Sequence, residues 1–588
     1  MKICCIDYSL AAELEKSGHA VHRLAVGPGI VHLARFTELK DADLLIQQER
    51  LGPRVILEGL ESLACQTAFI SVDTHLNLFW HRYYARLFDL VLTPHPTLFR
   101  NLPAASIGGA LENVRRLRHC GYERPWKDYA ARAHGISFCG VVDEHRPLRQ
   151  ALLRQAGSRF PLHRPAGRLA LGAMLDLFSD TRLLPNESIS EEVNFRLFEG
   201  ASCGCLVLGQ NIGEDQDACF EPGKEVATYE HALEFVEKLA FYQANTRAAE
   251  KMAKAAWLRV HREHLARHRA QELLDSAKEA ALAPGSRARG AQAEKYYHLT
   301  LLQLSRHGSL VLPANRLLRQ LMEIDADGEI AAATLQLLAE APLPDSPLYR
   351  AGASDWPDKE EEYATMGRYF SGKLIKDGLF ADSLACNLAG SMYARLHGDA
   401  FLAALFWERQ KEALLAAGKP LPRDGFPADP APDSPLGRDG AFYLFWAEVL
   451  ENAGLLARPG YRIRTLPGFM PESAMECLFL AQADQDAAAM SLPERCAFAA
   501  RLRRVSAGVK GCAYLSMGCL AQMSLFDQKN WRISLDYGLA LLKCLQLEPG
   551  LDEIAEARGK AEAAGQGDSF RRRLEESPAS DYILRILG

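Results

Sequence analysis

The first part of the chain alternates short apolar runs with longer stretches in which apolar residues recur at helical spacing. Short apolar runs bounded by turn residues are typical of buried strands, and strands that alternate with helices favour a parallel sheet covered by helices. Helices are expected between the strands, including residues 11–18 (AAELEKSG) and 55–64 (VILEGLESLA). The expected strands are residues 2–7, 20–26, 43–47, 67–72 and 89–93.

A second pattern of the same kind begins near residue 134. Strands are expected at residues 136–139, 181–186 and 205–209. Helices are expected at residues 146–155, 169–178, 191–202 and 231–243. Two consecutive units of this kind predict two Rossmann-like lobes, because each unit can form its own parallel sheet.

Beyond residue 283 the strand signals fade, and Ala- and Leu-rich helical periodicity continues to the end of the chain. Proline-rich loops are expected at residues 341–358 and 419–440, since each proline removes a helix hydrogen bond. The predicted fold class is α/β followed by all-α. The predicted domains are a first lobe at 1–130, a second lobe at 131–282, a linker at 283–292 and a helical domain at 293–588.

One stretch of the helical half, residues 383–414, resembles a tetratricopeptide repeat. Small residues there allow two helices to approach closely, and Gly398 suits the turn between them. Residues 533–554 give a weaker echo of the same pattern. The repeat period does not recur cleanly, so an irregular helical bundle remains the alternative.

Length and composition limit the functional classes. A chain of 588 residues predicts several domains, and its net charge of −6 argues against a broadly basic nucleic-acid binder. No apolar run approaches the roughly 20 residues of a membrane span. The first residues lack the pattern of a secretory signal, so a cytoplasmic protein is expected. The 14 cysteines include no Cys-x-x-Cys pair, which favours buried free thiols over zinc or disulfides.

The candidate chemistry lies in residues 185–209 (PNESISEEVNFRLFEGASCGCLVLG). Glu191 and Glu199 have seven residues between them, so on one helix they would share a face. A helix that follows a strand directs its first amides at a phosphate, and a carboxylate nearby can accept ribose hydroxyls. Arg196 could balance negative charge on a departing diphosphate. The alternative is a solvated helix face on which Glu192 pairs with Arg196.

This segment resembles the C-terminal lobe of the CgeB-like (spore maturation protein type) glycosyltransferases, which are related to the large retaining GT-B group. The family signature reads here as residues 194–204 (NFRLFEGASCG). The similarity continues downstream through residues 220–242 and 259–274. Upstream it includes residues 136–153, where a strand leads through Gly140 into a turn and a helix.

The resemblance implies a two-lobed transferase that uses a nucleoside-diphosphate sugar as donor, with no tightly bound cofactor and no metal. It places Glu199 on the donor ribose, with Asn194 and Arg196 near the diphosphate. Gly140 would allow close approach of the loop to the donor, and Arg146 would add positive charge. The predicted donor-binding set is Gly140, Arg146, Glu191, Asn194, Arg196, Glu199 and Gly204.

The first lobe is expected to supply the acceptor side. In residues 71–96, Asp73 and His75 follow a predicted strand, where ligands of open α/β sheets bind. Either side chain could deprotonate an acceptor hydroxyl, so we take both, with Arg196, as catalytic candidates. Asp73 could instead cap the following helix. His95, at the end of another predicted strand, is a weaker candidate.

The sequence therefore predicts a cytoplasmic enzyme that transfers a sugar from a nucleotide sugar to a protein, glycan or lipid-linked acceptor. Repeat-like helical domains present extended concave surfaces, so the helical half is expected to recruit the acceptor or a protein partner. Protein glycosylation is one such activity. A catalytically silent glycosyltransferase-like scaffold is the alternative, and a nucleotide-sugar epimerase on the same fold is a third class.

Overall fold

The computed structural model divides the chain into two compact units, each made of two stretches of sequence. The first unit combines residues 1–116 with 273–490, and the second combines residues 117–272 with 491–588. The structure describes residues 1–102, 110–144, 146–188, 190–281, 287–324, 327–342, 346–348, 360–377, 383–427, 437–457, 470–483, 490–507, 509 and 511–587.

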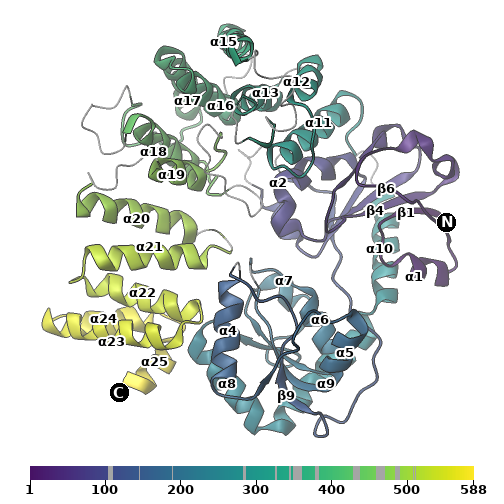
Figure 1. Cartoon of the computed structure of the whole chain (residues 1–588), viewed down its shortest axis with the longest axis vertical. Helices are drawn as coiled ribbons and strands as arrows, with labels where there is room; N and C mark the ends of the chain where they lie inside the picture. Colours follow the sequence, from purple (N-terminus) through teal and green to yellow (C-terminus); the bar gives the residue numbers. More distant parts are fainter. Residues whose placement is uncertain are drawn as a thin grey trace. The chain divides into compact units, whose positions relative to one another are not determined.

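The first unit contains a parallel sheet, as predicted, in the strand order β2-β1-β4-β6-β7-β8. Figure 1 labels β1, β4 and β6 of this sheet. Every neighbouring pair in it is parallel; Cys4, for example, aligns with Leu45. The apolar runs of β1 and β4 are almost fully buried, which is why they occupy the middle of the sheet. The strands are β1 (Lys2–Ile6), β2 (Ala20–Arg23), β4 (Leu44–Gln48), β6 (Gln66–Ile70), β7 (Leu90–Thr93) and β8 (Val114–Arg116), and the helices between them include α1 (Ala11–Lys16), α2 (Thr74–Tyr84) and α3 (Pro96–Arg100).

The helix predicted at residues 55–64 is wrong. Residues Val55–Glu58 form strand β5, which pairs in parallel with β3 (Gly29–His32). Gly59 then adopts a left-handed conformation with φ 94°, which ends the strand in a short 3-10 turn, Leu60–Ser62. A short apolar run cannot be assigned to strand or helix by periodicity alone, and here burial of Val55 and its neighbours in a sheet decides.

The second unit contains another fully parallel sheet, in the order β10-β9-β11-β12-β13. The chain runs from β9 to β10 on one side and then returns to β11 on the other side. The order therefore reverses between β9 and β11, the place where open α/β sheets bind ligands. The strands are β9 (His134–Ser137), β10 (Leu162–His163), β11 (Thr181–Pro185), β12 (Leu206–Gln210) and β13 (Ala227–Tyr229); the helices are α4 (Pro147–Gly157), α5 (Leu171–Ser179), α6 (Phe195–Ser202), α7 (Glu214–Asp217), α8 (Ala232–Ala244) and α9 (Thr246–Glu263). Helix α10 (Ala266–Ala281) begins in the second unit and ends in the first, which resumes at Leu273.

The helix predicted at residues 191–202 begins four residues later, at Phe195. Asn194 is its N-cap, because its side chain accepts a hydrogen bond from the Leu197 amide at 3.4 Å. Glu191 precedes the cap in a left-handed conformation, with φ 54°. Glu191 and Glu199 therefore do not share a helix face, contrary to the prediction.

The C-terminal half is mainly helical, as predicted, and its helices divide between the two units. The first unit holds α11 (Ala291–Arg306), α12 (Ala314–Glu323), α13 (Gly328–Glu340), α15 (Glu360–Asp377), α16 (Leu384–Leu396), α17 (Ala400–Ala416), α18 (Gly437–Asn452) and α19 (Ala474–Ala483). The second unit holds α20 (Leu492–Ala507), α21 (Ala513–Phe526), α22 (Trp531–Lys543), α23 (Leu547–Ala563), α24 (Gly567–Glu575) and α25 (Ser580–Leu587).

Two helix pairs in this half depend on glycine for close approach. In the pair α16–α17, a Cβ on Gly390 would lie 2.4 Å from the Phe406 ring, and Gly398 makes the turn with φ 74°. In the pair α22–α23, a Cβ on Gly538 would lie 2.9 Å from the backbone oxygen of Gly550. Such pairs are what the repeat-like pattern predicted, but their assignment as tetratricopeptide repeats stays a prediction.

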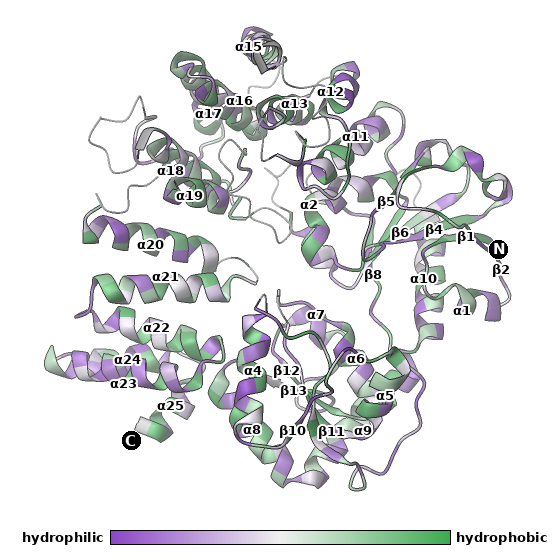
Figure 2. Cartoon of the chain, viewed as in Figure 1, coloured by the Kyte–Doolittle hydropathy of each residue, from purple (hydrophilic) through white to green (hydrophobic). Residues whose placement is uncertain are grey.

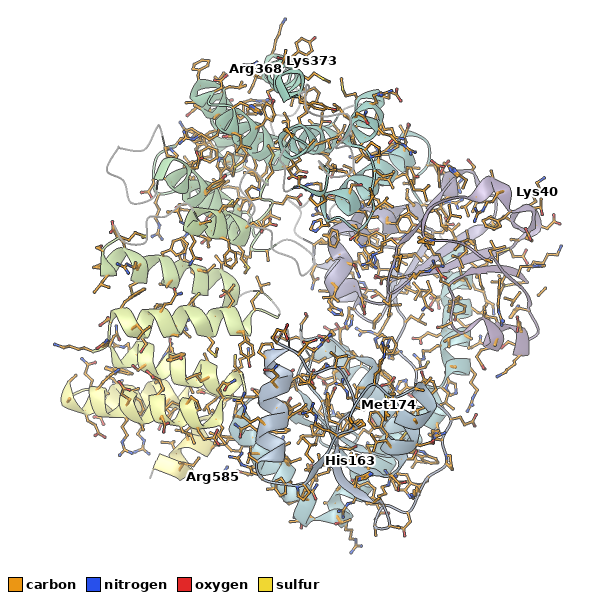
Figure 3. The ribbon with its side chains drawn as sticks, viewed as in Figure 1. Lys40, His163, Met174, Arg368, Lys373 and Arg585 are labelled. Carbon is orange, nitrogen blue, oxygen red and sulfur yellow. The ribbon has the colours of Figure 1, made fainter. Side chains whose placement is uncertain are left out.

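The helices α22–α25 share one hydrophobic core with the second sheet and its helices. Trp531 and Leu535 of α22 belong to the same cluster of buried residues as Ile136 of β9 and Leu152 of α4. Figure 2 shows hydrophobic residues along the strands and on the helices of this unit. At the edge, Arg585 of α25, labelled in Figure 3, donates to Glu237 of α8 at 2.8 Å. The last helices are thus part of the fold of the second lobe.

Candidate functional site

A buried ionic cluster lies at the carboxyl ends of β9 and β11. Glu187, which follows β11, is 1% exposed and accepts a hydrogen bond from Nε of Arg149 in α4. Arg149 also donates through Nη1 to the backbone oxygen of Val141, at 2.5 Å. Arg196 of α6 completes the cluster: its Nη1 lies 2.8 Å from the Asn186 side-chain oxygen and 3.7 Å from Glu187 Oε2.

The loop after β9 packs directly on Arg196. The guanidinium carbon of Arg196 lies 4.5 Å from the centroid of the Phe138 ring, a favourable cation–π distance. Gly140 has φ 154°, and a Cβ there would lie 2.9 Å from Arg196 Nη2. Any side chain at Gly140 would therefore displace the guanidinium. Gly140 and Arg196, both predicted donor-binding residues, are brought together.

Guanidinium groups gather around one deeply buried carboxylate in this cluster. Arg149 and Arg196 face one buried carboxylate, Glu187, and Arg146 at the start of α4 is near enough to affect Arg149. Burial lowers the pKa of Arg149; Glu187 raises it, and Arg196 and Arg146 lower it further. Oε2 of Glu187 is buried and accepts no hydrogen bond from any residue in the described part of the chain. Guanidinium groups gathered at the end of a parallel sheet can bind an anionic ligand, since each keeps donors that the buried carboxylate does not use.

Three side chains hold the segment after β11 in place. Asn194 donates to the Glu187 backbone oxygen at 2.9 Å while capping α6. Tyr229, at the end of β13, donates its hydroxyl to the Asn186 backbone oxygen at 2.9 Å. Gln210 accepts from the Ser188 amide at 2.7 Å. Asn194 was predicted near the diphosphate, and its contacts show it bound to the protein backbone.

Glu199 lies three residues after Arg196 in α6, so both side chains project from neighbouring positions on that helix. Burial raises the pKa of Glu199, and Arg196 opposes that change. The Glu199 carboxylate makes no hydrogen bond to any residue that the structure describes. A half-buried carboxylate with open acceptor positions is suited to binding hydroxyl groups of a ligand.

Three other residues of this lobe make their contacts outside the cluster. Glu192 binds Ser188 and the Ser190 amide, so the alternative pairing of Glu192 with Arg196 is wrong. Arg146 precedes α4 and pairs with Asp143. Gly204 lies beyond the far end of α6, with φ 76°, where a Cβ would lie 2.8 Å from Trp126. The structure therefore does not bring Gly204 to the cluster.

In the first unit, Asp73 and His75 lie after β6, as predicted. Asp73 is the N-cap residue of α2, but its side chain makes no capping hydrogen bond. His75 packs edge-on against His95, which follows β7, with the ring centroids 5.8 Å apart. The three candidates therefore lie at the carboxyl ends of neighbouring strands, since β6 pairs with β7.

A buried network beside Asp73 was not predicted from the sequence. Glu49, which follows β4 and is 3% exposed, accepts from the Val72 and Asp73 amides at 2.9 and 2.8 Å. Asn77 donates to Glu49 at 2.7 Å, and His81 lies 3.4 Å away. Burial alone would raise the pKa of Glu49, but His81 and the hydrogen bonds outweigh it and lower the pKa. The only sequence signal was an acidic residue directly after an apolar strand.

The described residues contain neither a candidate metal-binding cluster nor a candidate membrane-spanning helix. No group of three or more His, Cys, Asp or Glu side chains in the described part of the chain is arranged to hold a metal ion. Within the same residues, no helix has both the length and the apolar character needed to cross a bilayer.

Residues 142–275 match a protein-family model described as glycosyl transferase-like. This glycosyl transferase-like region contains Arg149, Glu187, Arg196 and Glu199. No curated protein matches the chain.

Two solved structures align with about half of the chain at low similarity. A glycosyltransferase from Rickettsia africae is 12% identical, with a TM-score of 0.34, and the match covers 48% of this chain and 98% of that one. A sucrose-phosphate synthase from Thermosynechococcus elongatus is 12% identical, with a TM-score of 0.36, over 48% of this chain and 100% of that one. Similarity at this level carries no functional assignment.

Proposed function

We propose that this protein is a GT-B-type glycosyltransferase, of the CgeB-like kind, whose second lobe binds a nucleoside-diphosphate sugar. The observation that carries the proposal is the Arg149–Glu187–Arg196 cluster beside Gly140, at the point where the strand order of the sheet reverses. A diphosphate needs concentrated positive charge and close access to backbone, and this edge of the sheet offers both. The match of residues 142–275 to a glycosyl transferase-like family agrees with it.

In this proposal Arg196 binds the diphosphate, and Arg149 and Arg146 add to the positive potential. Cleavage of the sugar–phosphate bond leaves negative charge on the departing diphosphate, and fixed guanidinium groups stabilise that charge without a metal ion. Glu199 accepts hydrogen bonds from the donor ribose. Glu187 holds Arg149 in position, and Asn194 holds Glu187 through its backbone.

The base that activates the acceptor belongs to the first lobe in this proposal. Asp73 or His75 takes the proton of an acceptor hydroxyl, and the backbone at Asp73 is fixed by Glu49. The acceptor is a protein, a glycan or a lipid-linked precursor, and the helical half recruits it or a partner protein in the cytoplasm. A catalytically silent scaffold that acts through the helices is the alternative function.

A thermal-shift screen against UDP-, GDP-, dTDP- and CMP-sugars tests the donor site. Binding to the folded state stabilises it by about 2.7 kcal/mol at about a hundred-fold excess of ligand over Kd. We expect Arg196→Ala to weaken the bound nucleotide sugar by about 10- to 100-fold, because a hydrogen bond from a charged donor is lost. Arg262→Ala, on the exposed surface of α9, is the control.

The outcomes separate the two functions. Unchanged nucleotide-sugar affinity in Arg196→Ala would show that the donor site lies elsewhere. If no nucleotide sugar in the panel stabilises the wild-type protein, the glycosyltransferase proposal fails and the scaffold gains support. Sugar transfer itself is measured by chromatography, as the release of free nucleotide when acceptor is added.

A further inference from the structure

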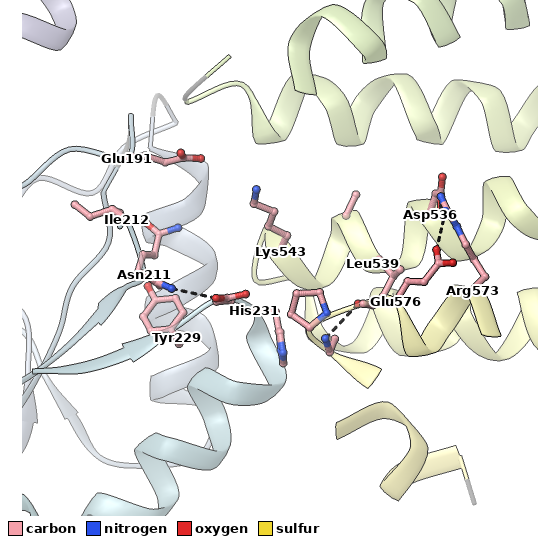
Figure 4. A pocket seen from close by; sticks show the side chains of 16 residues that line it. Glu191, Asn211, Ile212, Tyr229, His231, Asp536, Leu539, Lys543, Arg573 and Glu576 are labelled. Atoms are coloured by element: carbon pink, nitrogen blue, oxygen red, sulfur yellow. Dashed lines mark hydrogen bonds and ion pairs between the residues drawn. The ribbon is translucent and has the colours of Figure 1, made fainter. Parts of the chain in front are cut away.

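A cavity of about 550 Å³ lies within the second unit, where the second sheet meets the C-terminal helices (Figure 4). One wall comes from the ends of β12 and β13, including Asn211, Tyr229 and His231. The opposite wall comes from α22 and from the segment between α24 and α25, including Lys543 and Pro578. Nothing in the donor chemistry described above uses the α22 side of this cavity.

Most of the charged groups in the lining are already paired. Asp536 accepts from Arg503 at 3.0 Å and from Arg573 at 3.3 Å, and Arg573 also pairs with Glu576 at 3.0 Å. Glu230 accepts from Asn211 at 3.0 Å. The ion pairs of Asp536, Arg573 and Glu576 form the wall and leave little capacity for a ligand, whereas Glu230 is bound to a neutral amide and keeps its charge.

His231 forms part of the join between the two walls. Its Nδ1 accepts from the Glu234 amide at 3.2 Å, and its ring packs edge-on against Tyr582 of α25. Burial lowers the pKa of His231, which keeps the ring neutral, although the hydrogen bond to the Pro578 backbone opposes the change. This residue therefore fixes the wall and adds no charge to the cavity.

Two opposite charges in the lining have no hydrogen bond or ion pair with any residue in the described ranges: Glu191 and Lys543. Figure 4 shows Glu191 and Lys543 projecting from the two walls into the space between them. Glu191 reaches this position through a left-handed backbone conformation, with φ 54°. Such a conformation in a residue other than glycine is uncommon and concentrates at ligand sites.

The charges define the ligand. Glu191 and Lys543 carry opposite charges. An anion bound between them would be repelled by Glu191, and a cation would be repelled by Lys543. A sugar hydroxyl donates to a carboxylate and accepts from an ammonium, so a neutral saccharide satisfies both groups. Ile212, Leu539 and Pro578 line the same cavity and offer apolar contact for the C–H face of a sugar ring.

We propose that this cavity binds a neutral saccharide, held between Glu191 of the second lobe and Lys543 of α22. The cavity adjoins the Arg149–Glu187–Arg196 cluster, called the donor cluster below. Tyr229 lines the cavity and donates a hydrogen bond to the Asn186 backbone, and the Asn186 side chain accepts one from Arg196. The saccharide would then be the acceptor of the transfer. That role rests on the proposed function, whereas saccharide binding itself does not.

The test is calorimetric titration of the full chain with neutral probes: glucose, galactose, mannose, N-acetylglucosamine and their disaccharides. We expect Lys543→Ala to weaken the bound saccharide by about 10- to 100-fold, and Glu191→Gln to weaken it in the same direction. Lys529→Ala is the matched control, because Lys529 is exposed in the same helical region and does not line the cavity. Unfolding temperatures confirm that each variant is folded.

Three results would overturn the proposal: no neutral saccharide in the panel binds the wild-type chain, Lys543→Ala binds as well as wild type, or free glycine, a zwitterion, displaces the bound saccharide. The donor site is tested separately on the same proteins. Arg196→Ala should lose nucleotide sugar and keep saccharide, and Lys543→Ala should do the reverse. If nucleotide sugars fail to bind while the saccharide still does, the donor proposal falls and this one stands.

Discussion

At the scale of single residues, the donor cluster depends on one position without a side chain. Gly140 lies against Arg196, and Arg196 in turn contacts Asn186 and Phe138. The guanidinium is the flexible tip of a long side chain, so it can move away from an added methyl group. The cost of a substitution at Gly140 then falls mainly on ligand binding.

We expect Gly140→Ala to lower nucleotide-sugar affinity by about ten-fold and the free energy of unfolding by about 1–2 kcal/mol. The added Cβ would lie 2.9 Å from Arg196 Nη2, at a φ of 154° that L-residues rarely adopt. Calorimetry measures the affinity, and urea unfolding measures the stability. The control is Gly172→Ala in α5, where a Cβ meets nothing within 4 Å and alanine should stabilise the helix slightly. Wild-type affinity in Gly140→Ala would place the ligand away from Arg196.

At the scale of elements, close packing of α22 on α23 supports the α22 wall of the saccharide cavity. Gly538 of α22 faces Gly550 and Ile554 of α23. The obstacle to a larger residue here is partly backbone, in contrast to Gly140, so the helices themselves would have to separate. Lys543 lies in the last turn of α22 and would move with it.

Gly538→Ala should destabilise the second unit by about 1–3 kcal/mol, because overpacking forces the two helices apart. A Cβ on Gly538 would lie 2.5 Å from Ile554 Cγ1 and 2.9 Å from the Gly550 backbone oxygen. Gly559→Ala on α23 is the matched control, since a Cβ there meets nothing within 4 Å. Thermal and urea unfolding measure both variants. Equal stability of the two variants would contradict the close approach of the helices.

Elements that bury a regular apolar face could be predicted from the sequence, and those set by distant contacts could not. The central strands of both sheets follow apolar runs, whereas the short outer strands β8, β10 and β13 were not predicted. Residues 55–58 are as compatible with a helix as with a strand until β3 pairs with them. The start of α6 at Phe195 depends on the Asn194 cap. The left-handed φ of Glu191 could not be predicted, because the residue is not a glycine. Arg149 and Glu187 meet across 38 residues, a pairing that no local pattern contains.

At the scale of the whole molecule, the last helices belong to the interior of the second lobe. Trp531, Leu535 and Ile554 share a buried core with Ile136 and Leu152, which pack on and within the second sheet. Burial of apolar surface is the main contribution to stability. The second sheet therefore depends on these last helices as well as on the helices that lie between its strands.

A chain that ends at residue 490 should therefore lose the folded second lobe. Removal of residues 491–588 would expose the apolar faces that α22 and α23 cover, including those at Leu152 and Tyr229. We expect loss of nucleotide-sugar binding and rapid amide hydrogen exchange in β9–β13, with β1 and β4 still protected. Exchange measured by mass spectrometry checks this. Native-like protection of β9–β13 in the shortened chain would contradict the shared core.

The same shared core has an evolutionary consequence. Residues 491–588 follow the rest of the helical half in sequence, yet they complete the lobe that carries the donor cluster. A recombination event that exchanged this tail between related genes would replace part of that lobe's interior and one wall of its saccharide cavity together. Donor-lobe stability and saccharide preference would then be inherited as one trait, and the tail would diversify only in step with the lobe that it completes.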